Sequence, residues 1–325
     1  MGRDPRYTFG MASEVKTSNS PIFLVGATGT GKSAVAMELA RAFAGSGGAA
    51  ILAMDARQVY RGADIGTSKP TATERAEIPH GGLDMVDFGA SFDVAQYLKH
   101  VATFLEEQRT AGRRVIIVGG TGLYFRALTQ GLCEAPQGPE ELRAELSGLS
   151  TDELRERLRK VDPRMLERID GANPRRLVRA IEVMETTGRS LKVWQEETPE
   201  PLVKDFTAFW VCREKEELSR RIKKRVEEMF AQGWVEEVRG LMATYGVETV
   251  KAFAGIGYRE IAEMEEATAP SPGTTAATSE VKSDIWVATR QYAKRQLTWF
   301  AREPNLQKVM LTGSQPIFAV LPSLL

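Results

Sequence analysis

A glycine-rich stretch near the start of the chain, GATGTGKS, constrains the fold more than any other feature. It runs from Gly26 to Ser33 and has the spacing of a P-loop, which is a glycine, four residues and then Gly-Lys-Ser. The apolar run Ile22 to Val25 before it is typical of a buried strand, and the run from Ser33 to Phe43 has apolar residues at helical spacing. This order predicts a phosphate-binding turn between a strand and a helix.

The residue types of this loop suit an anion. Glycines let successive backbone N–H groups point at one phosphate, and the helix N-terminus adds partial positive charge. Lys32 supplies a full positive charge, and the Ser33 hydroxyl is placed to ligate Mg²⁺. The spacing leaves the identity of the phosphorylated ligand open, and an ordinary glycine-rich turn is the alternative interpretation.

Charge and cysteine content limit the classes of protein that fit. Lysine plus arginine and aspartate plus glutamate number 43 each, so the formal net charge is zero. A nucleic-acid partner would therefore need a local basic surface. The two cysteines, Cys133 and Cys212, lack metal-ligand spacing, and no run is long and apolar enough to span a membrane. These features indicate a cytoplasmic protein without a membrane partner, and we expect a monomer.

Strand and helix patterns alternate early in the chain. Strand patterns occur at 49–55 and 113–120, with an amphipathic helix pattern at 94–112 between them. This alternation predicts an α/β fold in which a P-loop parallel sheet is flanked by helices. The stretch 136–201 has almost only helical periodicity, which predicts an all-helical insertion domain. The predicted organisation is a disordered leader at 1–20, a P-loop α/β catalytic core at 21–135 and 202–325, and the helical insertion at 136–201.

The last third of the chain returns to the α/β pattern. A strand pattern at 205–212 and a long helix pattern are followed by a segment at 265–284 that is rich in Pro, Gly, Ser and Thr, which predicts a flexible loop. A final helix pattern begins at Ile285, and from Thr289 to Arg302 it carries basic residues and no acid, with aromatic residues interleaved. This mixture suits RNA backbone contact and base stacking, although the aromatic residues can equally be core residues.

The strand pattern at 49–55 ends in an acid, Asp55, whereas the one at 113–120 is followed by Thr121. Enzymes that split ATP with a P-loop usually hold Mg²⁺ with an acid at the end of a neighbouring strand. Asp55 therefore has two functional interpretations. It is a metal ligand, as in a kinase, or a general base that faces a nucleophile approaching the phosphate-bearing ligand. A solvated or helix-capping aspartate is the alternative without a function.

Five further blocks accompany the P-loop in a fixed order. They are MDARQVYRGADIGTSKP (54–70), GGTGLYFRAL (119–128), NPRRLVRAIEV (173–183), GIGYREI (255–261) and ATRQYAKRQLTWF (288–300). With these blocks the chain resembles the bacterial type of tRNA dimethylallyltransferase, or tRNA isopentenyltransferase, from about residue 21 to 302. The resemblance implies that the loop holds the diphosphate of dimethylallyl diphosphate. It also implies that the dimethylallyl group moves to the exocyclic N6 of the adenosine 3′-adjacent to the anticodon.

The resemblance implies roles for individual residues. Asp55 is the implied general base, and Thr121 the second catalytic residue, which helps to place the reacting amine. The implied diphosphate-binding residues are Gly26, Thr28, Gly29, Thr30, Gly31, Lys32, Ser33 and Arg225, with Mg²⁺ as the cofactor on Ser33. The residues implied to contact tRNA are Asp55, Ala56, Arg57, Gln58, Thr121, Arg143, Arg175, Arg176, Arg179, Lys294, Arg295 and Gln296. The insertion is implied to embrace the anticodon stem-loop.

The sequence departs from the family's pattern at three places. Ala56 follows Asp55 where serine is common, PHGGL (79–83) replaces PHHL, and Ala301 stands where arginine is usual after TWF. These departures bear on rate and on RNA contacts. Three alternative functions stay open at this point: an adenylate isopentenyltransferase that acts on free adenine nucleotides, a P-loop kinase, and an RNA-binding protein without activity. Transfer to AMP would identify the first, ATP turnover the second, and the absence of any turnover the third.

Overall fold

The computed structural model describes residues 20–268 and 275–313. They form two compact units, one made of the chain up to Phe125 together with the chain from Asp205 onward, and the other of Arg126–Lys204. The leader predicted at 1–20 lies outside the described residues except for its last residue.

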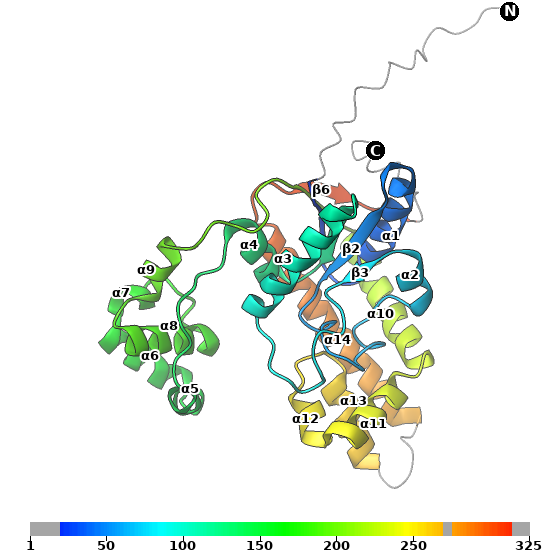
Figure 1. The fold of residues 1–325 in the computed structure, drawn as a ribbon. Helices are drawn as coiled ribbons and strands as arrows, with labels where there is room; N and C mark the ends of the chain where they lie inside the picture. The colour runs from blue at the N-terminus through cyan, green and yellow to red at the C-terminus, as the bar shows by residue number, and fades with distance from the viewer. Residues whose placement is uncertain (1–19, 269–274, 314–325) are drawn as a thin grey trace, which may run out of the picture. The chain divides into compact units, whose positions relative to one another are not determined.

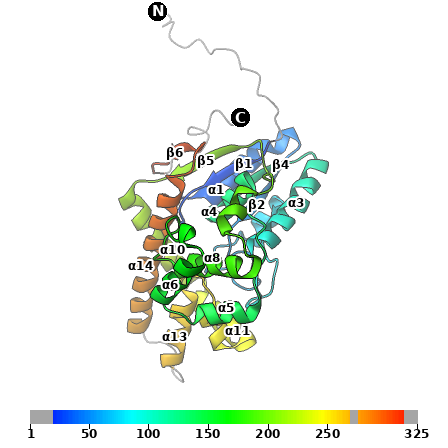
Figure 2. The ribbon, with the colours of Figure 1, turned by 90° about the vertical axis from the view of Figure 1, so that its left-hand side faces the viewer.

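The larger unit is built on a six-stranded parallel sheet with the strand order β3-β2-β4-β1-β5-β6 (Figures 1 and 2). The strands are β1 (Ile22–Val25), β2 (Ala49–Met54), β3 (His80–Gly81), β4 (Arg114–Gly119), β5 (Thr207–Cys212) and β6 (Gln307–Met310). The predicted α/β fold is confirmed. Because all strands run the same way, the loops after β1, β2, β4 and β5 meet at one edge of the sheet, which is where α/β proteins bind ligands.

Helices cover both faces of the sheet. Ile22 and Leu24 of β1 share a buried cluster with residues of α1 (Lys32–Ala42). The ring of Phe23 instead meets Phe125 of α4 (Gly122–Gln130), with ring centroids 5.3 Å apart. Since successive side chains of a strand point to opposite faces, α1 and α4 lie on opposite sides of the sheet.

The remaining helices of the larger unit gather around two long ones. Helix α10 (Lys215–Ala231) and helix α14 (Thr275–Phe300) run side by side (Figures 1 and 2). The others are the 3₁₀ turn η1 (Phe43–Ser46), α2 (Ala72–Glu77), α3 (Val94–Thr110), α11 (Trp234–Tyr245), α12 (Val247–Ala252) and α13 (Tyr258–Thr268).

The prediction of a loop at 265–284 is wrong for every residue of this range that the structure describes. Residues up to Thr268 belong to α13, and α14 begins at Thr275, about ten residues before the predicted start. Ala277, Val281 and Ile285 are spaced by four, and all three pack on the buried cluster that contains Ile261. Burial of this helical stripe outweighs the weak helix propensity of the serines and threonines around it.

The smaller unit is all-helical. Its helices are α5 (Glu140–Ser147), α6 (Thr151–Val161), α7 (Pro163–Leu166), α8 (Pro174–Thr187) and α9 (Leu191–Glu196). Helix α8 is capped by Asn173, whose side chain accepts from the N–H of Arg176, and it ends at Gly188 with a φ of 66°. The segment after α9 is held to the end of α4, since the Val203 N–H donates to the Leu128 carbonyl at 2.9 Å.

No helix within the described ranges combines the length and the apolar character needed to cross a membrane.

Candidate active site

Strand β1 delivers the P-loop to the C-terminal edge of the sheet. Gly29 and Gly31 have φ values of 81° and 95°, a backbone conformation that glycine adopts without strain. Helix α1 begins at Lys32, so the N–H groups of Lys32 and Ser33 in its first turn lack partners inside the helix. The predicted order of strand, turn and helix is observed, and the loop offers backbone donors and a helix N-terminus to an anion.

Lys32 is the charged residue of this loop, and it is nearly buried. Its ammonium donates to the Ala27 carbonyl at 2.6 Å. Burial and the positive charge of Arg225 lower the pKa of Lys32 to about 7, while the charge of Asp55 acts in the opposite direction. Burial also lowers the pKa of the half-buried Arg225, against the opposing effect of Asp55. Two cations and one acid thus share one electrostatic neighbourhood.

Two arginines bind the outer side of the P-loop. Arg221 of α10 donates through Nε to the Gly29 carbonyl at 3.0 Å, and Arg213, just after β5, donates through Nε to the Thr30 carbonyl at 2.8 Å. In a planar trans peptide the C=O and N–H point in opposite directions, so fixing these two carbonyls fixes the N–H groups of Thr30 and Gly31. Arg213 was missed by the sequence analysis. The signal that could have found it is a basic residue directly after a strand pattern.

Helix α14 contacts the same loop from another side through Gln296. The side-chain oxygen of Gln296 accepts from the N–H of Thr28 at 2.9 Å, and its nitrogen donates to the Gly120 carbonyl at 2.9 Å. A Cβ at Gly120 would lie 2.1 Å from that nitrogen, so glycine is needed for the approach. Gln296 is buried and both ends of its amide are used here, whereas its predicted companions in tRNA contact, Lys294 and Arg295, are exposed.

Asp55 and Thr121 follow the neighbouring strands β2 and β4, where Met54 pairs with Gly119. One carboxylate oxygen of Asp55 accepts from the N–H of Arg57 at 2.8 Å, which orients the carboxylate. The N–H of Ala56 donates to the Thr121 hydroxyl at 3.3 Å. The two predicted catalytic residues are therefore brought together by one backbone contact, which does not require the serine hydroxyl that Ala56 lacks.

The charge of Asp55 affects the pKa of three tyrosines. Tyr97 and Tyr124 stack with ring centroids 4.2 Å apart, and the Tyr97 hydroxyl donates to the Ala53 carbonyl at 3.0 Å. Burial raises the pKa of both phenols, and the negative charge of Asp55 adds to this effect. Burial and then Asp55 raise the pKa of Tyr292 to about 12. All three phenols therefore stay neutral at neutral pH. Sequence reasoning missed Tyr97 and Tyr124, although Tyr124 lies in the GGTGLY block.

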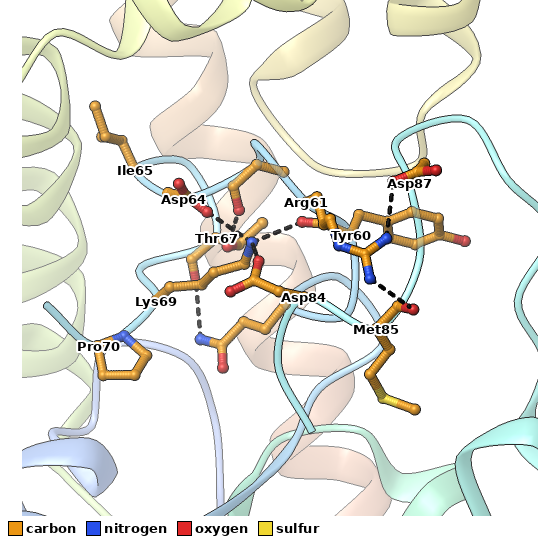
Figure 3. A network of polar contacts seen from close by, with 12 residues as sticks. Tyr60, Arg61, Asp64, Ile65, Thr67, Lys69, Pro70, Asp84, Met85 and Asp87 are labelled. Carbon is orange, nitrogen blue, oxygen red and sulfur yellow. Dashed lines mark hydrogen bonds and ion pairs between the residues drawn. The ribbon is translucent and has the colours of Figure 1, made fainter. Parts of the chain in front are cut away.

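The segment after Asp55 is held by side-chain contacts. Gln58 donates both hydrogens of its amide nitrogen, to the Thr67 carbonyl at 3.0 Å and the Ser68 carbonyl at 3.1 Å. The Arg57 guanidinium lies over the ring of Phe253 at 5.5 Å. The Gln58 contacts reach the loop 60–70, and Figure 3 shows the polar network around that loop.

The smaller unit carries the other residues predicted to contact tRNA. Arg175 and Arg176 are exposed in the first turn of α8. Arg179 uses its guanidinium within the unit, donating to the Ala135 carbonyl at 2.5 Å and the Pro136 carbonyl at 3.0 Å. Arg143 is exposed, with its Nε 3.7 Å from the Glu182 carboxylate. Arg175 and Arg176 are thus the arginines of the RRLVR run whose charges face solvent.

The oxygen donors near the P-loop are too few to hold a metal ion by themselves. Across 20–268 and 275–313, no group of three or more His, Cys, Asp or Glu side chains is arranged to hold a metal. The exposed Ser33 hydroxyl at the start of α1 supplies one oxygen. In phosphate sites Mg²⁺ keeps several waters and takes further ligands from the phosphates. These residues fit a Mg²⁺ that binds together with a diphosphate.

Comparisons with known proteins point to one family. The family model described as IPP transferase matches residues 58–303. The tRNA dimethylallyltransferase of Methylacidiphilum infernorum is 40% identical over 306 residues, covering 94% of this chain and 90% of that protein. The crystal structure of the tRNA isopentenylpyrophosphate transferase from Bacillus halodurans is 28% identical, with a TM-score of 0.63 and coverage of 93% and 94%.

A eukaryotic dimethylallyltransferase solved while acting on tRNA shares the fold, with a TM-score of 0.78 at 23% identity, and covers 93% of this chain and 77% of that one. The P-loop after β1, the acid after β2 and the GGTG stretch at the end of β4 lie at the same edge of the sheet, and the sequence match extends over nearly all of the chain. The chain therefore belongs to the IPP transferase family, as one of the tRNA dimethylallyltransferases, which are prenyltransferase enzymes.

Proposed function

We propose that the enzyme transfers the dimethylallyl group of dimethylallyl diphosphate to N6 of the adenosine 3′-adjacent to the anticodon in tRNA, and releases diphosphate. The observation that carries the proposal is the shared electrostatic neighbourhood of Asp55, Lys32 and Arg225. Beside a diphosphate, an acid repels the ligand unless it holds the metal ion that binds with the diphosphate. An acid beside the cations is useful when a second substrate must lose a proton there.

The P-loop side of the site supports departure of diphosphate. When the allylic C–O bond breaks, its electron pair stays on the diphosphate oxygen. The N–H groups of Lys32 and Ser33 at the start of α1, together with the Lys32 and Arg225 side chains, are positioned to stabilise that growing negative charge. Mg²⁺ held by the Ser33 hydroxyl and diphosphate oxygens would supply further positive charge when it is bound.

The β2 side of the site supports attack by the amine. The lone pair of adenine N6 is delocalised into the ring, so the amine is a poor nucleophile until it loses a proton. As the N–C bond forms, the N6 proton passes to the Asp55 carboxylate, whose orientation is fixed by the Arg57 N–H. The Thr121 hydroxyl, held beside Ala56, helps to place the amine.

The tRNA contacts follow from exposed basic residues on two elements. Reaching N6 requires the adenosine to leave its stack, and Asp55 to Gln58 would meet the flipped base. Lys294 and Arg295 on α14 would bind RNA phosphates, as would Arg175 and Arg176 on α8. We infer that the helical unit, including Arg143 and Arg179, contacts the anticodon stem-loop. We expect the active enzyme to be a monomer.

The test is incubation of the enzyme with unmodified tRNA, Mg²⁺ and dimethylallyl diphosphate labelled in the allyl group, followed by nucleoside analysis. The expected product is N6-dimethylallyl adenosine at the position after the anticodon. Transfer to AMP without transfer to tRNA would contradict the proposal, and so would ATP turnover in place of prenyl transfer.

A further inference from the structure

A buried lysine, Lys69, lies at the centre of the polar network in Figure 3. Its side chain is 1% exposed, and its ammonium donates to the Tyr60 carbonyl at 2.6 Å, to the Asp64 carboxylate at 2.6 Å and to the Asp84 carboxylate. An ammonium group has three hydrogens, so all of its donors are used. A buried charge with this many partners specifies one arrangement of the chain around it.

The network joins the loop after β2 to a second segment. Besides Lys69, the Asp84 carboxylate accepts from Arg75 at 2.6 Å. The N–H of Asp84 donates to the Gln58 carbonyl at 3.1 Å, and the N–H of Met85 to the Val59 carbonyl at 2.7 Å. Asp84 has a φ of 52°, which is strained for a residue other than glycine, so its neighbours must hold it there. Lys69 supplies one of those contacts.

Gln58 is bound to the two residues that directly precede Lys69. Thr67 and Ser68 directly precede Lys69, and their carbonyls take both hydrogens of the Gln58 amide nitrogen. Ser68 also has a positive φ, 53°, so the direction of its carbonyl depends on the residues that fix the loop. The Gln58 side-chain oxygen accepts no hydrogen bond from the described part of the chain. Gln58 is therefore an acceptor only.

A separate contact keeps the rest of the loop in place. The Glu237 carboxylate accepts from the N–H groups of Asp64 at 2.9 Å, Ile65 at 2.6 Å and Gly66 at 3.3 Å. The Tyr258 hydroxyl donates to the same carboxylate at 2.7 Å. Because these contacts do not involve Lys69, the loop keeps an anchor at 64–66 when Lys69 is replaced.

We propose that Lys69 is a positioning residue for the transfer reaction. It fixes the carbonyls of residues 67 and 68 against the Gln58 amide, which leaves the Gln58 oxygen as an acceptor for an amino group on the bound base. Adenosine carries such a donor at N6. The proposal rests on the proposed function, and it adds that the selection of an amino-bearing base depends on a buried cation that does not touch the ligand.

The experiment replaces Lys69 with Met, which is neutral and of similar length. The kcat/KM for tRNA should fall by about 100-fold, the scale expected when a reacting group is misplaced by about 1 Å. The dissociation constant of inorganic diphosphate should stay within about twofold of wild type, since the P-loop is held by Arg213, Arg221 and Gln296 instead. Arg61→Gln is the control, because Arg61 lies in the same network but forms an exposed pair with Asp87.

A double-mutant cycle with Gln58→Ala tests the route of the effect. If Lys69 acts through Gln58, the double variant should lose no more tRNA activity than Gln58→Ala alone. Additive losses would overturn the proposal, as would an equal loss of diphosphate affinity, which would indicate a general structural role.

Should Lys69→Met fail to fold, Arg75→Gln weakens the same Asp84 anchor from a partly exposed position. It should reduce kcat/KM for tRNA without changing diphosphate affinity, and wild-type tRNA kinetics in Arg75→Gln would overturn the proposal. Absence of any transfer to tRNA by the wild-type enzyme contradicts the proposed function instead, so the two failures are distinguishable.

Discussion

At the scale of single residues, the proposed chemistry depends most directly on two side chains, Asp55 and Lys32. The backbone N–H of Arg57 holds one oxygen of the Asp55 carboxylate, so the other oxygen has a defined direction. Lys32 is buried beside Arg225, and this explains why its pKa falls to about 7 while a solvated lysine stays charged at neutral pH. One residue is thus suited to take a proton from an amine, and the other to gain a proton when an anion arrives.

The first prediction concerns the base. Asp55→Asn should reduce turnover by about 10²- to 10⁴-fold, because general-base catalysis contributes on that scale. The affinity for inorganic diphosphate should not fall, since the substitution removes a negative charge near the anion. Single-turnover rates and calorimetric titration measure the two effects. Asp87→Asn, which alters an exposed carboxylate, is the matched control, and wild-type turnover in Asp55→Asn would refute the assignment.

The second prediction concerns Lys32. Above pH 7 the free enzyme holds Lys32 largely neutral, and a bound diphosphate stabilises its charged form, so binding there should be accompanied by proton uptake. Titrations in buffers of different ionisation enthalpy measure the number of protons taken up. Lys32→Met should abolish this uptake and weaken diphosphate binding. The same proton uptake in Lys32→Met and wild type would show that another group is responsible.

Among the helices, α14 carries within one turn a residue that contacts the P-loop and two residues that we propose to bind RNA. Gln296 points into the P-loop, whereas Lys294 and Arg295 are exposed. The basic character of this helix was predictable from sequence, since its charges and aromatic residues are local features. The P-loop contact of Gln296 was not, because its partner Thr28 is 268 positions away and no local pattern reports such a pairing.

The third prediction separates these two functions of α14. Replacing both Lys294 and Arg295 with Ala should weaken tRNA binding and make its salt dependence shallower, by a slope of about 0.7 to 0.9 for each lost phosphate contact. Diphosphate affinity should be unchanged. Gln296→Leu should have the reverse effect, because it frees the Thr28 N–H and the Gly120 carbonyl while leaving the exposed charges in place. An unchanged salt slope in the double variant would remove α14 from the RNA surface.

Local sequence patterns predicted most of the elements that build the site. The P-loop, the acid after β2 and the strands on either side are short motifs with fixed spacing, so they were predicted close to their observed bounds. Arg213 and Lys69 were not recognised, because each acts through a backbone carbonyl brought close by the fold. The start of α14 was missed because packing on a distant cluster decides it.

The fourth prediction concerns the stability of the chain as a whole, and it follows from its only two histidines. The N–H of Gly82 donates to Nε2 of His100 at 3.1 Å, which requires a neutral ring, and His80 contacts the Ile78 carbonyl at 2.7 Å. Burial lowers the pKa of both rings, against weaker opposing effects from Glu107 on His100 and mainly from the Ile78 carbonyl on His80.

Near pH 6.5, the pKa of an unfolded histidine, both rings therefore bind fewer protons in the folded chain than in the unfolded chain. The unfolded state binds more protons in that window, so the free energy of unfolding should fall as the pH falls below 6.5. Urea denaturation at several pH values measures this slope. His100→Gln keeps an acceptor for the Gly82 N–H but cannot titrate, so its stability should depend less steeply on pH than that of wild type. An identical slope in His100→Gln would mean that the acid sensitivity arises from other groups, such as His80 or the carboxylates, and that the His100 contact does not contribute to it.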